Sequence, residues 1–275
     1  MLVLKTNITS KNQNLPVLGI TPAEVNILKM KPTAWLSGNS GVVLNGTAVT
    51  SVADRTGKYT WSLVSPTTAH PPRQLTSGSR KVLRFGIGVG GDGIGALKKA
   101  GDEATYPADG VFTLFALIRI PLPNTSGYTG TGGNLCGNNS AGPDLARFRF
   151  GSDSYMGNEI YYNHGSKSSA DTSNYPLATP IAPDFRDNAW HILVITARAN
   201  AHTLEWDGAV LQQTAIAAKA FATDESRRMT IGSADSPFNH SFMGHVAELI
   251  LIPRALSDDN KADVVQFMND VKSAL

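Results

Sequence analysis

Short apolar segments recur along the chain from Ala34 onward, separated by clusters of glycine, proline, asparagine, aspartate and serine. Several segments alternate apolar and polar residues with the period of two that a half-buried β-strand requires. In HILVITARA, which begins at His191, both sets of alternate positions are apolar, and this predicts a central strand buried on both faces. Short strands separated by turn residues are typical of a β-sandwich rather than of βαβ units. The pattern therefore predicts an all-β fold.

The repeated segments occupy most of the chain after residue 33. In chain order they are AWL, AVTSVA, YTWSLV, KVLRFGI, VFTLFALIRI, ARFRF, EIYYN, WHILVITARA, HTLEWDG, AVLQQT, RMTIGS and HVAELILI. The dipeptide Asp207-Gly208 stands between two of them and favours the positive φ angles of a two-residue type I′ turn. We therefore predict a β-hairpin over residues 204–212.

The chain closes with a strand followed by a helix. HVAELILI, residues 245–252, predicts a buried strand, which Pro253 ends because proline has no N–H to donate. Ser257 is a suitable N-cap, and Asp258 and Asp259 place negative charge at the positive end of the helix dipole. Apolar residues then recur at helical spacing, namely Val264, Val265, Met268, Val271 and Leu275. This stripe predicts a C-terminal α-helix that packs on the sandwich.

The first part of the chain has a different character. Residues 1–31 are polar and lack a clear period, so we predict an N-terminal arm over 1–31 and one sandwich domain with its helix over 32–275. Thr21-Pro22 is a suitable start for a short helix within the arm. The first residues lack the charged-then-apolar order of a signal peptide, and the longest apolar run, VFTLFALI, is too short to span a bilayer. We expect no signal peptide and no membrane insertion.

Composition argues against several classes of partner and site. The 275 residues include 24 basic and 22 acidic ones, and a net charge of +2 gives no footprint for nucleic acid. Arg80, Lys81 and Arg84 form the nearest approach to a basic cluster and are interpreted as a solvated strand face. The single cysteine, Cys136, excludes an intrachain disulfide, and the Cys-His spacing of a zinc site is missing. We assign no cofactor and no metal site.

The closing segment also carries a family resemblance. GHVAELILIPRALSDD, residues 244–259, resembles the closing strand and turn of concanavalin A-like, LamG-type jelly rolls. AWLSGNSGVVLNGTAVTSVADRTGKYTWSL, residues 34–63, resembles the opening of a subgroup of these domains, and VLRFG, FTLFALIRI, DNAWHILVITARANAHTLEWDGAVL and MTIGS follow in the family's order. The resemblance implies a concanavalin A-like jelly-roll β-sandwich. Domains of this subgroup occur in bacteriophage tail and baseplate proteins and in bacterial surface proteins, usually as non-catalytic adhesion modules.

Some concanavalin A-like folds are glycosidases, which need two suitably spaced carboxylates. Glu205 and Asp207 stand at alternate positions of one strand and have the required spacing. Asp207, however, is the first residue of the Asp-Gly turn, and the third acid of the Glu-x-Asp-x-x-Glu pattern of glucanases is absent. We therefore interpret the acidic pair as part of the hairpin and its turn, and we assign no catalytic residue.

Four other motifs favour structural explanations. The glycine-rich GIGVGGDGIG, residues 86–95, lacks the long helix that a dinucleotide site needs after it, so it predicts a loop. His191 starts a strand in AWHILV, and the pair His240 and His245 lacks a nearby carboxylate cluster for a metal ion. Cys136 has no obvious base beside it in the sequence, which gives no support to nucleophilic catalysis.

The best candidate for ligand binding comprises two loop-rich segments, 124–144 and 152–166. Sugar sites combine an aromatic platform with amides and other groups that hydrogen-bond hydroxyls. The second segment offers these residue types at Tyr155, Asn158, Tyr161, Tyr162, Asn163 and His164. Tyr161 and Tyr162 face opposite sides of a strand, so one of them belongs to the core. The alternative explanation is that the polar residues only keep the loops soluble and the aromatic residues belong to the core.

Three hypotheses for function remain. In the first, the chain is a non-enzymatic bacteriophage virion component of the tail, fibre or baseplate, whose lectin-like sandwich binds a host-surface glycan or receptor. In the second, it is a structural virion or capsid-decoration protein that makes mainly protein contacts. The third, a glycan-cleaving enzyme, has the least support. We expect contacts with other virion proteins through the arm, assembly in the host cytoplasm with release by lysis, and a homo-oligomer, which in a fibre would be a trimer.

Overall fold

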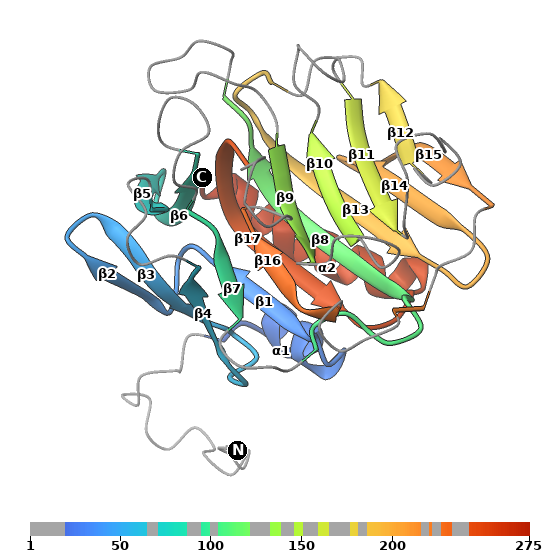
Figure 1. The fold of residues 1–275 in the computed structure, drawn as a ribbon, viewed down its shortest axis with the longest axis horizontal. Helices are drawn as coiled ribbons and strands as arrows, with labels where there is room; N and C mark the ends of the chain where they lie inside the picture. Colours follow the sequence, from blue (N-terminus) through green and yellow to red (C-terminus); the bar gives the residue numbers. More distant parts are fainter. Residues whose placement is uncertain are drawn as a thin grey trace.

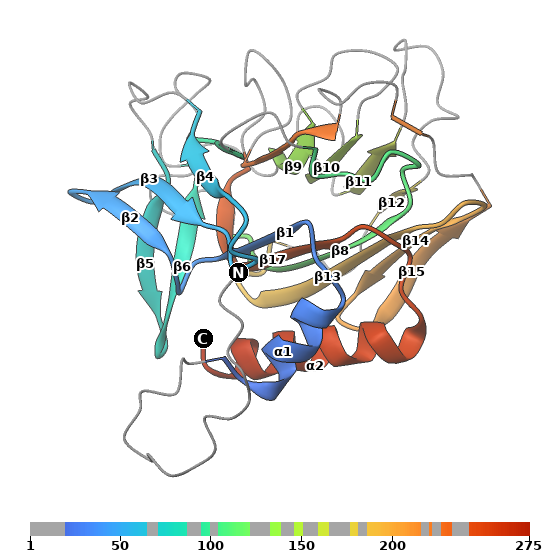
Figure 2. The same cartoon turned by 90° about the horizontal axis from the view of Figure 1, so that it is seen from below.

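The computed structural model describes residues 20–64, 71–86, 95–99, 104–121, 133–138, 146–150, 159–164, 177–180, 186–215, 220–221, 227–232 and 242–275. These residues form three layers, which Figure 2 shows in edge view: two antiparallel sheets face each other, and two helices cover the free face of one of them. We call the sheet between the helices and the other sheet the middle sheet, and the remaining one the outer sheet.

The middle sheet is centred on the strands that the sequence marks as most apolar. Its order is β15 (Ala209–Thr214), β14 (His202–Trp206), β13 (Trp190–Ala197), β8 (Phe112–Arg119) and β17 (Gly244–Ile252). Two strands then share the remaining edge of β17, β6 (Arg80–Phe85) at its start and β1 (Ala34–Ser37) further along, while β5 (Arg73–Ser77) pairs with β6. The register of β17 against β8 shifts between Val246 and Glu248, close to where the edge passes from β6 to β1.

The outer sheet consists of strands of three to six residues (Figure 1). Its order is β12 (Leu177–Pro180), β11 (Glu159–His164), β10 (Ala146–Phe150), β9 (Gly133–Asn138), β16 (Met229–Ile231), β7 (Leu97–Lys99), β4 (Thr60–Leu63), β3 (Ala48–Ala53) and β2 (Val42–Asn45). All these pairings are antiparallel. The predicted β-sandwich is therefore confirmed.

The main core lies between the two sheets. Its fully buried aromatic residues include Trp61, Phe85, Phe112 and Phe242, and aliphatic residues from both sheets fill the space around them. The strands HILVITA and VAELILI contribute to this core through one set of alternate positions. Their other set of positions faces the helices, which explains why both sets are apolar in the sequence.

The second core lies between the middle sheet and the helix layer, which comprises α1 (Pro22–Lys29) and α2 (Asp258–Ser273). Ser257 caps α2 by accepting a hydrogen bond from the Asn260 N–H, as its position in the sequence predicts. The buried face of α2 is formed by Val264, Phe267, Met268 and Val271. Phe267 meets Trp35 of β1 edge to face, with ring centroids 5.6 Å apart. The predicted C-terminal helix, packed on the sandwich, is confirmed.

The described part of the predicted N-terminal arm belongs to the folded body. Residues 22–29 form the short helix expected after Thr21-Pro22, with a capping box between Thr21 and Glu24. The helix buries Ile27 completely, and Met30 follows it into the second core. Ala23 and Leu28 pack partly against the same core, but the helix is so short that its few apolar residues did not give a readable period in the sequence. Residues 22–30 thus contribute to the second core, while the predicted division of the chain at residue 31 stays a prediction, and residues 1–19 lie outside the described residues.

Two turns fix the positions of strands and helices. The β14–β15 hairpin has φ angles of 47° at Asp207 and 84° at Gly208, the positive pair that a type I′ turn requires. The C-terminus closes against the β5–β6 turn, where the Ser79 N–H donates to the Ala274 carbonyl at 2.9 Å. Gly78 in that turn has a φ of 54°, and a Cβ there would collide with the same carbonyl.

Neither described helix has the length and apolar character needed to cross a membrane.

Candidate functional site

The two faces of the outer sheet can be distinguished by strand register. Leu97, Ile231, Cys136 and Phe148 pair in succession across β7, β16, β9 and β10, and all four belong to the main core. The neighbouring positions pair in the same way and are polar or glycine, namely Lys98, Thr230, Gly137, Arg147 and, in β11, Asn163. Consecutive strand positions lie on opposite faces. This second row therefore lies on the outward face of the outer sheet, which neither described helix covers (Figure 2).

The structure places part of the predicted ligand site on this sheet. Tyr161, Tyr162, Asn163 and His164 are positions of β11, and the structure describes their backbone but not their side chains. Position 162 pairs with Phe148 in the core row, whereas position 163 belongs to the polar row. Tyr155 and Asn158 lie outside the described residues. The predicted ligand site thus stays a prediction, now located at one strand of the outer sheet.

Asn134 adds an unexpected feature to the same face. It belongs to the other sequence segment singled out for binding, 124–144, and pairs in β9 with Arg149, whose other partner is position 161. The Asn134 side chain is fully buried, and neither its oxygen nor its nitrogen has a hydrogen-bond partner. An unpaired buried amide costs about 1–3 kcal/mol. Sequence reasoning missed it because a lone asparagine in a glycine-rich segment resembles loop chemistry.

The acidic pair considered for catalysis is engaged in structural contacts. Glu205 accepts a hydrogen bond from the Lys261 ammonium of α2 at 2.6 Å. Asp207 accepts from the Ile192 N–H and from Lys272, both at 3.0 Å, and contacts His191 at 2.6 Å. Burial alone would raise the pKa of Asp207, but these hydrogen bonds outweigh it and lower the pKa to about 2. Both carboxylates therefore tie the hairpin to its surroundings.

His191 sits between two carboxylates rather than in a catalytic arrangement. Its Nδ1 lies 2.6 Å from Asp207 and its Nε2 lies 3.0 Å from Asp187, while its ring stacks on Trp206 with centroids 4.6 Å apart. Burial disfavours the protonated ring, but the hydrogen bonds and charges of the two aspartates prevail and raise the pKa of His191. Both ring nitrogens are occupied, which agrees with the structural role predicted for this residue.

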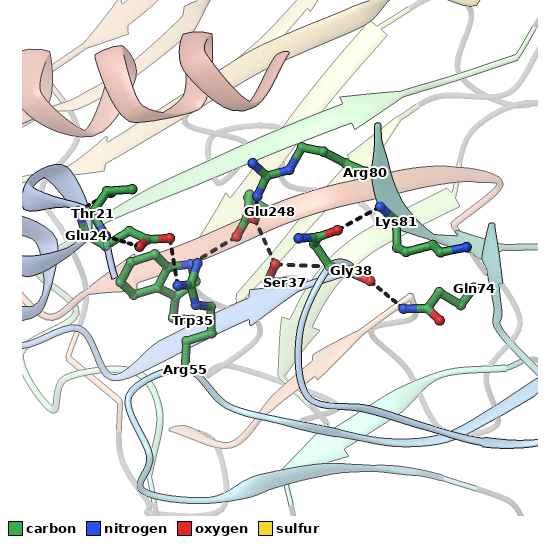
Figure 3. Close-up of polar contacts among 11 residues, drawn as sticks. Thr21, Glu24, Trp35, Ser37, Gly38, Arg55, Gln74, Arg80, Lys81 and Glu248 are labelled. Carbon is green, nitrogen blue, oxygen red and sulfur yellow. Dashed lines mark hydrogen bonds and ion pairs between the residues drawn. The ribbon is translucent and has the colours of Figure 1, made fainter. Parts of the chain in front are cut away.

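Glu248 is a buried acid at the centre of a polar cluster that the sequence did not predict (Figure 3). Its side chain is fully buried and accepts hydrogen bonds from the Trp35 indole N–H at 3.0 Å and the Ser37 hydroxyl at 2.8 Å. Arg80 lies 3.6 Å away, so this arginine does not belong to a solvated strand face as expected. Burial raises the pKa of Glu248 to about 7 despite the hydrogen bonds and the nearby Arg55 and Arg80.

The contacts around Glu248 continue into the helix layer (Figure 3). The Arg55 guanidinium lies 4.5 Å from the ring centroid of Trp35 and donates to Glu24 of α1 at 2.7 Å. On the other side, the Gln74 amide donates to the Gly38 carbonyl at 2.8 Å. A carboxyl group with a raised pKa is often functional, but this one has no access to solvent. Its contacts hold β1 and β6 to β17, and Arg55 connects α1 to the same cluster through Glu24 and Trp35.

Two further features, the Cys136 thiol and one pocket, give little support for a functional site. Burial raises the pKa of the Cys136 thiol to about 12, so the reactive thiolate is suppressed at neutral pH. A pocket of about 380 Å³ lies beside residues 104–109 and Arg227, and its described lining includes none of the residues predicted for ligand binding. Among the described residues, no group of three histidine, cysteine or acidic side chains is arranged to hold a metal ion. His240 lies outside these residues.

Comparisons with known proteins give a fold rather than a family. No protein-family model matches the chain, and no curated protein sequence matches it. Among solved structures, domain 4 of AbnA, a GH43 extracellular arabinanase from Geobacillus stearothermophilus solved with arabinotriose, is similar with a TM-score of 0.56 and 12% identity. The match covers 85% of this chain and 98% of that domain.

Two toxin structures are similar to the same extent. The binding domain of Paraclostridial Mosquitocidal Protein 1 has a TM-score of 0.53 and 13% identity over 85% of this chain. A structure of botulinum neurotoxin type C, whose cell entry is dependent upon interaction with two ganglioside molecules, has a TM-score of 0.53 and 11% identity over 90% of this chain. The chain spans about half the length of each, 52%. At these identities the likeness establishes the sandwich fold alone.

Proposed function

We propose that the chain is a non-enzymatic glycan-binding module whose ligand site lies on the outward face of the outer sheet, around β11. The main supporting observation is the row that joins Asn134, Arg149 and position 161 across three strands. An amide without partners, a cation and a tyrosine position are the group types that sugar recognition combines. Asn163 stands two positions from 161 in β11 and shares its face, whereas Tyr162 and His164 stand at the alternate positions of the core row. Tyr155 and Asn158, which precede β11 in the sequence and lie outside the described residues, remain further candidates for this site.

The engaged acidic pair supports a role without catalysis. A glycosidase needs one carboxyl group as an acid and a second as nucleophile or base, both free to reach the substrate. Glu205 is paired with Lys261, and Asp207 accepts contacts from three groups. Domain 4 of AbnA, a sandwich from an arabinanase that was solved with arabinotriose, illustrates that a fold of this kind can accompany glycans.

The test is a binding and cleavage assay on an array of bacterial surface polysaccharides. The chain should show saturable binding to at least one polysaccharide and release no new reducing ends. Tyr161→Ala combined with Asn163→Ala should weaken that binding by about 1–3 kcal/mol if these positions form the hot spot. Asn269→Ala, an exposed asparagine of α2, is the matched control and should bind like the unmodified chain.

Two outcomes would contradict the proposal. Reducing ends that appear with the unmodified chain and vanish with Glu205→Gln would establish glycan cleavage. Unchanged binding by the Tyr161 and Asn163 variant would place the glycan site elsewhere. If no polysaccharide binds at all, the structural alternative, a virion or capsid-decoration protein with mainly protein contacts, becomes the preferred hypothesis.

The proposed biological setting is a bacteriophage tail, fibre or baseplate, with other virion proteins as partners through the N-terminal arm. The family resemblance of the closing segment is its support. Under this proposal the chain assembles in the host cytoplasm, leaves by lysis and forms a homo-oligomer, a trimer in a fibre. Recovery of the chain from purified particles tests the location, and light scattering of the purified chain tests the trimer.

A further inference from the structure

A row of basic residues crosses the outer face of the middle sheet beyond the helices. In register, Arg73 of β5 pairs with Arg84 of β6, Arg84 with His245 of β17, and His245 with Arg119 of β8. Arg119 then pairs with Trp190 of β13. We call these five residues the basic row. Neighbouring strands lie about 4.8 Å apart, so the row is about 19 Å long.

The basic row lies on the same face as the second core. Val82, Leu117 and Ile192 stand two residues from Arg84, Arg119 and Trp190 in their strands, and all three belong to the core under the helices. Positions two apart share a face. The helix-covered residues are fully buried or nearly so. In contrast, Arg73 is exposed, and Arg84, Arg119 and Trp190 are partly exposed. The row therefore forms a surface at the edge of the helix-covered area.

The row concentrates positive charge at a cost to the fold. Arg73 and Arg84 stand directly opposite each other, and like charges in directly opposed positions destabilise a sheet. The pKa of His245 falls to about 3, first because the ring is buried and then because of the charges of Arg119 and Arg84. The only acid in the neighbouring described positions of β17, Glu248, is buried and engaged with Trp35 and Ser37. Arg73, Arg84 and Arg119 therefore bring three cationic side chains to this end of the sheet.

Two polar atoms in the row lack a hydrogen-bond partner within the chain. The Nδ1 atom of His245 and the indole nitrogen of Trp190 are both shielded from water and form no hydrogen bond. His245 is 6% exposed, and its ring contacts Trp190 with centroids 6.3 Å apart. The Arg119 guanidinium lies 5.0 Å from the centroid of the same tryptophan ring. Unpaired buried polar atoms are rare in folded proteins, and a ligand bound beside the partly exposed aromatic ring would account for them.

We infer that the basic row is a second binding site, which takes a linear acidic polysaccharide with its carboxylate groups on the arginines and one sugar ring against Trp190. Guanidinium groups match carboxylates in a bidentate geometry. Three arginines spread along a row of about 19 Å suit an extended polyanion better than a single small anion. The site is separate from the one proposed on the outer sheet, so either can fail without the other.

The test measures retention of the full chain by polygalacturonate at low salt, with neutral dextran as the reference polymer. The unmodified chain should bind polygalacturonate and not dextran, and added salt should weaken the binding because the contacts are ionic. Arg73→Ser combined with Arg84→Ser should reduce the affinity by about tenfold or more. Trp190→Phe keeps an aromatic ring but removes the indole N–H, and we expect a smaller loss.

A matched control separates this site from general charge. Lys58→Ser combined with Arg254→Ser removes two exposed cations outside the row and should leave the affinity within about twofold. The inference is overturned if the control loses as much affinity as the arginine variant, or if the unmodified chain ignores polygalacturonate. It is also overturned if single-stranded DNA binds more tightly through the same arginines. Thermal unfolding of each variant shows whether the fold is intact, and Trp190→Phe provides a second variant if the arginine pair does not fold.

Discussion

The two ends of one face of the middle sheet differ in burial. Along β8, Phe115 and Leu117 lie under the helices and are fully buried, whereas Arg119, two residues further on the same face, is partly exposed. β13 shows the same change in the other direction, from partly exposed Trp190 to buried Ile192 and Val194. A single strand therefore passes from core to surface within two residues.

The helix layer divides the face into a packed part and an uncovered part, for which we propose a role in recognition. Under α1 and α2, apolar side chains gain stability by leaving water, at about 25 cal/mol per Å² of apolar area. In the basic row, opposed arginines and unpaired polar atoms lower stability instead. Features that weaken a fold are retained where they serve binding. Glu248 lies between the two parts and connects them through Trp35 and Arg80 (Figure 3).

The largest effect is expected in the helix-covered part. Val264 of α2 is fully buried in the second core, so Val264→Asp would bury an unpaired charge. We expect a loss of about 4 kcal/mol or more in the free energy of unfolding, measured by urea denaturation. Gln266→Ala, at an exposed position of the same helix, should change it by less than about 0.5 kcal/mol. Equal stability of the two variants would mean that α2 does not pack as described.

The second prediction concerns α1, which the sequence assigned to an arm. Ile27→Ala removes a fully buried side chain from the second core and should cost about 2–4 kcal/mol, seen as a lower midpoint in urea denaturation. Val25→Ala, at an exposed position of the same helix, is the control and should have little effect. A negligible cost of Ile27→Ala would restore the interpretation of residues 20–31 as a dispensable arm.

The third prediction uses the acid at the boundary. The pKa of Glu248 lies above its ordinary value of 4.5, so the folded state holds this proton more tightly than the unfolded state. Its contribution to stability is complete below pH 4.5 and is lost as the pH rises toward 7, by at most about 3 kcal/mol. Glu248→Gln cannot ionise and should show a flatter decline between pH 5 and pH 8. Parallel pH profiles for both chains would contradict the assignment.

The smallest change in the free energy of unfolding is expected in the basic row, where we predict an increase rather than a loss. Arg73→Ser removes one of two directly opposed like charges, so the free energy of unfolding should rise by about 0.5 kcal/mol. Lys58→Ser, outside the row, should leave it unchanged within error. A loss of more than about 1 kcal/mol in Arg73→Ser would indicate that the arginine serves the fold rather than a ligand.

Much of the fold is readable from the sequence because its determinants are local. The alternating segments, the Asp207-Gly208 turn and the Ser257 cap each depend on a few consecutive residues, and all three occur as predicted. The predicted stripe of α2 contains three of the four buried residues but omits Phe267. It also includes Val265, which is only partly buried because the sheet, rather than the spacing, decides which side of the helix is covered.

The contacts of Glu248 and the proposed basic row could not be read in this way because they depend on non-local pairing. Trp35 reaches Glu248 across 213 residues of sequence, and no local pattern marks that contact. The members of the basic row are equally scattered, and only the register of five strands brings them together. Arg80 and Arg84 look like one solvated pair in the sequence, yet one contacts a buried acid and the other joins the row. His245 was considered as a metal ligand and belongs to the row as well.

The central claim is that the helix layer packs one part of the molecule while the uncovered sheet faces bind glycans. Hydrogen–deuterium exchange with and without a bound acidic polysaccharide tests it most directly. The account predicts slower exchange in β6, in the first residues of β17 and at the end of β8 when polygalacturonate is bound, with α2 unchanged. Slower exchange confined to α1 and α2, with no change in those strands, would contradict it.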